Sequence, residues 1–179
     1  MTSPIFTPKG EVNVRIATVQ DAVTLLALRL EALAMHPEAF AADVDKTAAE
    51  GKMVWVERLI EYANTKSGAI MIAQARDEQI GMSGIVRGHW PKTQHSGNLW
   101  GMYVKPDWRG HKIGDAIVSG CTTWAIENKL TVITLEVTSS NNSAIRCYNR
   151  CGFEAYGIAP KAIFYNGTYY DNMLMAKLI

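Results

Sequence analysis

The segment VKPDWRGHKIGDAI (104–117) lies where a predicted strand gives way to a predicted helix. Unpaired backbone N–H groups and the positive end of a helix dipole meet at such a junction, so anions bind there readily. Gly110 and Gly114 keep side chains away from an approaching ligand, and basic residues dominate the loop. The segment therefore predicts either a phosphate-binding loop or an ordinary surface turn. Nucleoside-triphosphate and dinucleotide loops are excluded, because neither Gly-Lys-Ser/Thr nor GxGxxG is present.

On both sides of this segment, stretches whose apolar residues recur at the strand period of two alternate with stretches at the helix period of 3.6. Predicted strands cover 12–18, 69–75, 79–88, 98–104, 131–137, 153–158 and 168–177, and predicted helices cover 21–35, 48–63, 114–128 and 141–152. The two prolines and the glycine of residues 1–11 predict a flexible N-terminal arm. We find no repeat or linker in the remainder, so residues 12–179 are expected to form a single domain.

Composition excludes several classes of protein. The chain has 179 residues and a formal net charge of +1, which argues against a nucleic-acid binder. No apolar run reaches the roughly 18 residues of a membrane span, so no membrane association is expected. Cys121, Cys147 and Cys151 form an odd set without a CxxC pair, which predicts neither disulfides nor a zinc site. We interpret the cysteines as small buried apolar side chains, and the chain as cytoplasmic.

A second segment, LEVTSSNNSAIRCYNRCGF (135–153), leads from a strand into a short helix closed by Gly-Phe. Together the two segments, in this order and at this distance, resemble the Gcn5-related N-acetyltransferase (GNAT) family. The resemblance extends from about residue 12 to residue 179, because the order of elements also matches. It implies a mixed α/β fold, the GNAT-like acyl-CoA N-acyltransferase fold, with a central, mostly antiparallel twisted sheet flanked by helices. It also implies acetyl-CoA as cosubstrate, with no metal.

The resemblance assigns the cofactor-binding residues. The family pattern Arg/Gln-x-x-Gly-x-Gly/Ala, whose backbone amides wrap the CoA pyrophosphate, maps onto Arg109, Gly110, His111, Lys112, Ile113 and Gly114. Lys112 departs from the pattern, which usually has glycine there, and a positive φ would cost this residue roughly 1 to 2 kcal/mol. We expect its ammonium group to compensate by pairing with a phosphate.

Two further assignments follow from the resemblance. Met102, Tyr103 and Val104 match the end of the strand whose backbone pairs with the pantetheine arm, and only their main-chain groups are expected to act. Asn141 matches the asparagine that follows the next strand in the family.

Tyr148 matches the family tyrosine near the thioester sulfur and is the predicted catalytic residue. Many relatives carry a glutamate on the strand equivalent to 98–104, but this stretch has no carboxylate and begins with Asn98. Deprotonation of the attacking amine through water is therefore favoured, with Glu136, His95 and Asp171 as unranked alternatives. No His and Asp pattern accompanies Cys147, so we do not expect a cysteine nucleophile.

The implied function is transfer of acetyl from acetyl-CoA to a primary amine of a small molecule, by direct attack in a ternary complex. The alternatives are a protein N-terminal or lysine acetyltransferase, and a catalytically idle CoA-binding or assembly module. The acceptor pocket is expected between the first two helices, the loop around 90–97 and the hairpin around 158–172. Residues in these segments that could line it are Glu31, His36, Phe40, Trp90 and Tyr165, and Trp100 and Trp108 could line its mouth. Members of the family often pair, which leaves a homodimer open.

Overall fold

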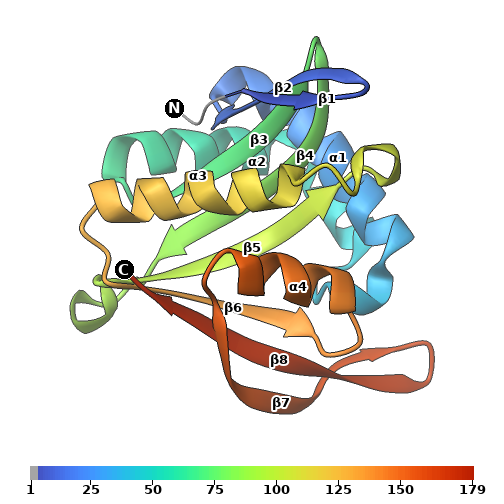
Figure 1. Cartoon of the computed structure of the whole chain (residues 1–179), viewed down its shortest axis with the longest axis vertical. Helices are drawn as coiled ribbons and strands as arrows, with labels where there is room; N and C mark the ends of the chain where they lie inside the picture. The colour runs from blue at the N-terminus through green and yellow to red at the C-terminus, as the bar shows by residue number, and fades with distance from the viewer. Residues whose placement is uncertain (1–3) are drawn as a thin grey trace.

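The computed structural model describes residues 4–179, which form an eight-stranded sheet with helices on both faces (Figure 1). The sheet order is β1-β2-β3-β4-β5-β6-β8-β7, and only β5 and β6 are parallel neighbours. The strands are β1 Ile5–Thr7, β2 Gly10–Ile16, β3 Gly68–Ala75, β4 Glu78–Arg87, β5 Ser96–Val104, β6 Val132–Thr138, β7 Glu154–Tyr165 and β8 Thr168–Leu178. The helices are α1 Ala22–Met35, α2 Val44–Thr65, α3 Ile113–Glu127 and α4 Asn142–Arg150. This arrangement confirms the predicted fold class.

Helices cover the sheet from both sides, with α1 and α2 behind it and α3 and α4 in front in Figure 1. Strand β3 shows why both layers form. Its residues Ile70 and Ile72 pack in the cluster with α1 and α2, whereas Met71 and Ala73 pack in the cluster with α3. A strand buried on both faces has no polar positions to alternate, which explains the nearly continuous apolar run.

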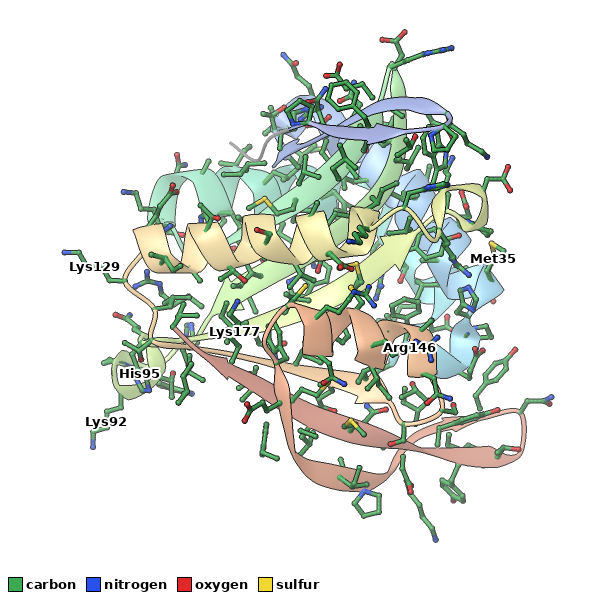
Figure 2. The ribbon with its side chains drawn as sticks, in the orientation of Figure 1. Met35, Lys92, His95, Lys129, Arg146 and Lys177 are labelled. Atoms are coloured by element: carbon green, nitrogen blue, oxygen red, sulfur yellow. The ribbon has the colours of Figure 1, made fainter. Side chains whose placement is uncertain are left out.

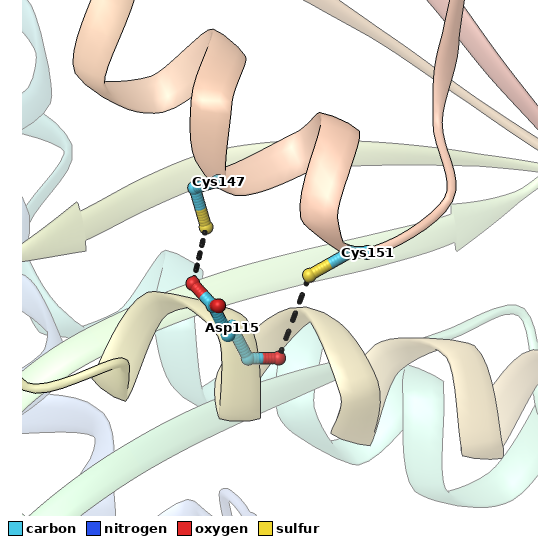
Figure 3. A group of neighbouring side chains, drawn as sticks. All are labelled: Asp115, Cys147 and Cys151. Carbon is cyan, nitrogen blue, oxygen red and sulfur yellow. Dashed lines mark hydrogen bonds between the residues drawn. The ribbon is translucent and has the colours of Figure 1, made fainter.

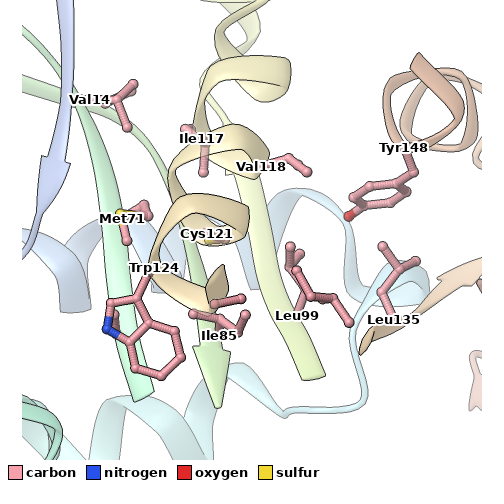
Figure 4. Packing of buried hydrophobic residues seen from close by; sticks show 14 of the residues in the cluster. Val14, Met71, Ile85, Leu99, Ile117, Val118, Cys121, Trp124, Leu135 and Tyr148 are labelled. Atoms are coloured by element: carbon pink, nitrogen blue, oxygen red, sulfur yellow. The ribbon is translucent and has the colours of Figure 1, made fainter. Parts of the chain in front are cut away.

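Helix α3 fixes the position of the loop that precedes it. Its apolar side chains recur at spacings of three and four, and they lie against the strands (Figure 4). Ile117, Cys121 and Ala125 are fully buried there. Full burial of a large apolar side chain such as Ile117 stabilises the folded state by roughly 1.5 to 3 kcal/mol. These contacts fix the position of the helix on the sheet. Residues 105–112, which connect β5 to α3, therefore lie at the C-terminal end of β5.

The N-terminal segment differs from its prediction. Ile5–Thr7 pairs in an antiparallel manner with residues 10–12 at the edge of the sheet, which corrects the expected flexible arm for residues 5–11. The strand has only three residues, too few for a period of two to be recognised. Residues 1–3 of the predicted arm lie outside the described residues.

Within residues 4–179, no helix combines the length and the apolar character that crossing a bilayer requires. The cytoplasmic location and the homodimer stay predictions.

An ion pair between buried Asp21 and half-exposed Arg15 joins the start of α1 to the sheet. Both carboxylate oxygens of Asp21 accept hydrogen bonds from the guanidinium of Arg15 at 2.8 Å. The same carboxylate accepts a bond from the Thr18 backbone N–H at 2.7 Å and one from the Gln79 amide at 2.8 Å. The hydrogen bonds from Arg15 are the largest cause that lowers the pKa of Asp21 below 3.8.

We predict that Asp21→Ala lowers the free energy of unfolding by about 1.5 kcal/mol at pH 7, because it removes a bidentate charge-assisted pair whose arginine side chain is still 40% exposed. A carboxyl with a lowered folded-state pKa contributes stability above its unfolded pKa, and loses it as pH falls through the folded pKa. The difference between wild type and variant should therefore shrink below pH 3.8, the ordinary pKa of the group. Urea unfolding at a series of pH values measures it. Equal stability of the two proteins at pH 7 would contradict the assignment.

Candidate functional site

The sheet opens between β5 and β6. The two strands pair in parallel from Ser96 and Val132 to Leu99 and Leu135, and beyond this point they diverge (Figure 1). Strand β5 stays paired with β4 up to Val104, and β6 stays paired with β8. The backbone of β5 after Leu99 therefore borders a gap rather than a partner strand. Backbone polar groups require partners, so this edge is suited to pair with an extended ligand.

A bulge shapes the open end of β5. Gly101 has φ +66, a conformation that a residue with a side chain rarely adopts, and the register with β4 shifts at this position. After the bulge, Met102 and Val104 pack toward the α3 side and Tyr103 packs toward α1. The Tyr103 hydroxyl donates to Glu31 at 2.9 Å, and burial together with this carboxylate raises the pKa of Tyr103 to about 12. The Tyr103 side chain thus fixes β5 against α1. This agrees with the expectation that only the main-chain groups of Tyr103 face the ligand.

The loop before α3 presents free backbone donors. From Gly110 to Asp115, no backbone N–H group has a hydrogen-bond partner among residues 4–179, and the first helical bond runs from Ala116 to the Lys112 carbonyl. The N-terminus of α3 has no side-chain cap in the described part of the chain. Consecutive free N–H groups at the positive end of a helix dipole form a binding site for phosphate oxygens.

Lys112 occupies the strained position of this loop. Its φ of 58 lies in the left-handed region that favours glycine. A non-glycine residue in this conformation costs roughly 1 to 2 kcal/mol, so the predicted cost applies. The chain turns twice within three residues, since Gly110 also has a positive φ of 83, and no heavy atom lies within 4 Å of a Cβ built on it. A ligand can therefore approach the loop backbone closely.

Arg109 is held across the mouth of the gap. Its Nε donates to the Val104 carbonyl at 3.0 Å, and its terminal nitrogen lies 3.0 Å from His36 Nε2. The guanidinium also stacks over the Tyr103 ring, 5.7 Å from its centroid. These contacts tie the loop to the end of β5 and to the residue that ends α1.

Helix α4 forms the opposite wall of the gap. Asn141 caps this helix, because its side-chain oxygen accepts from the Ala144 backbone N–H at 3.2 Å and from the Ser143 hydroxyl at 2.9 Å. One turn further on, Tyr148 is 5% exposed and packs edge-on against Phe153. The Tyr148 hydroxyl has no hydrogen-bond partner among residues 4–179, and burial raises its pKa above the ordinary value of 10. The phenol is thus a neutral donor that lines the gap.

Cys147 of α4 and Cys151, the residue that follows this helix, face α3 beside this wall (Figure 3). Cys147 donates to the Asp115 carboxylate at 3.2 Å, and Cys151 donates to the Asp115 carbonyl at 3.8 Å. Arg150 donates two further bonds to the same carboxylate, at 2.8 and 2.6 Å. These contacts join the two helices, so both thiols are polar partners rather than the apolar fillers predicted for them; Cys121 alone is fully buried. Hydrogen bonding with Cys151 and burial raise the pKa of Cys147, which disfavours a nucleophilic thiolate.

A cavity of about 690 Å³ unites these elements. It is lined by the predicted residues Met102, Tyr103, Val104, Arg109, Gly110, Lys112, Ile113, Gly114, Asn141 and Tyr148. His36, Phe40 and Trp108 also line it, as do Asp115 and Arg150, which were not predicted. The ion pair of Asp115 with Arg150 links α3 to α4, which are separate in the sequence. The local signals for it were an acidic residue in the first turn of α3 and a basic residue in the last turn of α4. His111 is the one predicted member of the loop that does not line the cavity.

Several sequence candidates lie elsewhere. His95 precedes β5 and lies at the end of the sheet remote from Met35 and Arg146 (Figure 2). The loop around 90–97 lies at the same end, and neither His95 nor Trp90 lines the cavity. Six strand residues separate Ser96 from Met102, a distance of roughly 20 Å.

The two remaining candidate bases are engaged in the sheet. Glu136 accepts from Asn172 at 3.1 Å, and Asp171 accepts from the Lys161 backbone N–H at 2.7 Å. Neither of them lines the cavity, and the same is true of Tyr165.

The family model described as the acetyltransferase (GNAT) family matches residues 30–153. The split in the sheet lies beside a helix N-terminus with free amides, an arrangement typical of proteins that bind a phosphate-bearing ligand within the sheet. The match to the family model shows that the chain belongs to the GNAT family.

Two relatives are similar in sequence. The L-amino acid N-acetyltransferase AaaT of Escherichia coli is 26% identical over 129 residues, which are 70% of this chain and 75% of that protein. An uncharacterized protein of Mycobacterium leprae is 30% identical over 106 residues. This match covers 59% of the chain but only 28% of the relative.

Solved structures share the fold. An acetyltransferase of the GNAT family from Streptococcus pneumoniae has a TM-score of 0.80 at 21% identity, covering 94% of this chain and 99% of the other. Ribosomal-protein-alanine N-acetyltransferase from Brucella melitensis has a TM-score of 0.75 at 24% identity, covering 93% and 99%. The acetyltransferase yncA from Salmonella typhimurium, solved with acetyl-CoA, has a TM-score of 0.75 at 17% identity, covering 93% of each chain.

We predict that Lys112→Gly raises the free energy of unfolding by about 1 kcal/mol, because it relieves the left-handed strain at some cost in chain entropy. Removal of the ammonium should weaken CoA binding by about fivefold, with a shallower salt dependence. Thermal unfolding and calorimetric titration with CoA measure the two effects.

Lys129→Gly is the matched control. Lys129 also has a left-handed φ, of 61, but it is exposed at the far end of α3 (Figure 2). Its replacement should stabilise the fold and leave CoA binding unchanged. Tighter CoA binding by the Lys112 variant, with the salt dependence of wild type, would show that the ammonium does not pair with a phosphate.

Proposed function

We propose that the chain transfers the acetyl group of acetyl-CoA to a primary amine of a small molecule, in a ternary complex. The observation that carries this proposal is the run of unpartnered N–H groups from Gly110 to Asp115, located where the sheet opens. The residues fit the cosubstrate: the loop and Lys112 would bind the pyrophosphate, and the free edge of β5 at Met102–Val104 would pair with the pantetheine arm. A likeness to a structure solved with acetyl-CoA supports the same fit.

The transfer requires one bond to form and one to break. The lone pair of the amine nitrogen attacks the thioester carbonyl carbon, and the carbon–sulfur bond then breaks and leaves a thiolate. Tyr148 is the donor to this sulfur. Its raised pKa lies above that of a thiol, about 8.5, so the phenol stabilises the thiolate through a hydrogen bond and keeps its proton. The sulfur takes its proton from water.

The amine must lose a proton to water during the reaction. The open part of β5 carries no carboxylate, and His36, which does line the cavity, is engaged with Arg109. Glu136, His95 and Asp171 lie outside the cavity. The carboxylates that do line the cavity are engaged as well: Asp115 accepts from Arg150, and Glu38 lies 3.8 Å from His36 Nδ1. Relay through water is therefore the proposed route.

A small acceptor is favoured by the relative AaaT, which is an L-amino acid N-acetyltransferase. A protein N-terminus is the second candidate, supported by the structural likeness to a ribosomal-protein-alanine N-acetyltransferase. An assay of thiol release from acetyl-CoA, with amino acids, polyamines and short peptides as acceptors, separates them. We expect release with amino acids. Release with peptides alone would favour the protein acceptor, and stabilisation by CoA without any release would favour an idle binding module.

We predict that Tyr148→Phe lowers kcat by roughly tenfold or more, since a hydrogen-bond donor aimed at charge that develops in the transition state contributes about 10² to 10³ in kcat. CoA affinity should stay the same, because the ring and its contact with Phe153 are retained. In wild type, the phenol should remain protonated beyond pH 10, so activity should not decline at the ordinary pKa of tyrosine. Steady-state kinetics across pH measure both effects. Unimpaired turnover of the variant would remove Tyr148 from the mechanism.

A further inference from the structure

A second cavity, of about 270 Å³, lies on the face of the sheet covered by α1 and α2. It is lined by two arginines, by aromatic and apolar side chains and by a few polar ones: Arg29, Arg58, Trp55, Tyr62, Trp100, Ala42, Val54, Thr47 and Glu50. The residues that bring the two arginines together come from α1, α2 and β5.

Arg29 is the less ordinary of the two. It belongs to the apolar face of α1 and is only 9% exposed. Its guanidinium stacks on the Phe40 ring at 4.7 Å, but the terminal nitrogen Nη1 is buried and has no hydrogen-bond partner among residues 4–179. A buried donor without a partner costs about 1 to 3 kcal/mol, more when the group is charged. Such a cost is tolerated where a ligand supplies the partner.

Arg58 adds a second positive charge. Its guanidinium lies over the rings of Trp55 and Trp100, at 5.2 and 5.3 Å from their centroids. In the described part of the chain, neither Arg29 nor Arg58 forms a salt bridge, and Glu50 is not paired with them. Burial, and then the charge of Arg58, lower the pKa of Arg29 to about 10. Arg29 is still charged at pH 7, so the cavity holds two unneutralised cations.

The cavity adjoins the acetyl-transfer cleft. Phe40, on which Arg29 stacks, lines the cleft. On the strand side, a Cβ built on Gly101 would lie 3.6 Å from Arg29 Nη1. Gly101 immediately precedes Met102, the first residue of the open edge of β5 in the cleft. A molecule with its anionic group at Arg29 can thus extend toward the point where β5 meets the cosubstrate.

We propose that Arg29 and Arg58 bind the carboxylate of the acceptor, so that the substrate class is amino acids whose amino group points into the cleft. This inference rests on the proposed function. A guanidinium and a carboxylate match in geometry, and their charge-assisted hydrogen bonds are about twice as strong as neutral ones. The aromatic and aliphatic remainder of the cavity wall is suited to an apolar side chain.

Binding of reaction products tests the proposal without requiring turnover. N-acetyl-L-leucine and N-acetyl-L-phenylalanine would be titrated calorimetrically into the protein saturated with CoA, each beside its uncharged carboxamide. We expect the acids to bind roughly tenfold or more tightly than the carboxamides, the difference expected for a charge-assisted pair. Arg29→Met and Arg58→Met should each abolish this preference and leave carboxamide binding unchanged.

Arg29→Met keeps the side-chain volume and removes a buried charge, a change that folded proteins often tolerate. Arg58 is more exposed, so its variant provides the same test with less dependence on the core. Arg76→Met, in the exposed turn between β3 and β4, is the matched control and should retain the preference. Equal binding of acids and carboxamides by wild type, or a preference that survives in both cavity variants, would overturn the proposal.

Failure of the proposed function is a separate outcome. A protein that prefers the acids but releases no thiol from acetyl-CoA has the carboxylate site and lacks the transfer activity. A protein that acetylates amines and shows no preference has the activity and lacks the site.

Discussion

The loss of hydrogen bonding between β5 and β6 beyond Leu99 and Leu135 is the constraint on which the rest of the structure depends. A sheet edge in the interior of a protein is costly unless something pairs with it. Here the edge borders a cavity that the N-terminus of α3 also lines, and the first turn of α3 leaves its N–H groups unpaired as well. Two sets of free backbone groups thus converge on one cleft, and an extended ligand with a diphosphate satisfies both.

The sheet also divides the chemistry between its two faces. On the α3 and α4 side lie the loop from Gly110 to Asp115 and Tyr148, which would serve the cosubstrate in the proposed function. On the α1 and α2 side lies buried Arg29, where we propose that the acceptor carboxylate binds, and the bulge at Gly101 lies between the two. Two residues that lower the stability of the fold lie at these sites: Lys112, which has a left-handed backbone, and Arg29, whose buried Nη1 has no hydrogen-bond partner among residues 4–179. Functional sites are where such costs are retained.

Local signals in the sequence predicted most of the fold and the cosubstrate side of the cleft. The apolar spacing of α3 and the Gly-rich turn before it are short-range patterns, and the resemblance that assigns Tyr148 also rests on a short segment around one helix. For the acceptor, the sequence predicted a pocket beside the first two helices but not Arg29 and Arg58, because their convergence depends on contacts between distant elements. Arg29 interrupts the apolar face of α1 after Leu25 and Leu28, but only the packing of α2 and β5 around it reveals a cavity. The remote position of His95 likewise follows from the sheet order and has no local signal.

The most direct test of the central claim is a calorimetric comparison of CoA with pantetheine, which has the same arm and thiol but no diphosphate. If the amides from Gly110 to Asp115 bind the diphosphate, CoA should bind about a hundredfold or more tightly, and the difference should decline with added salt. Equal affinities for the two compounds, or no binding of CoA to the folded protein, would contradict the account.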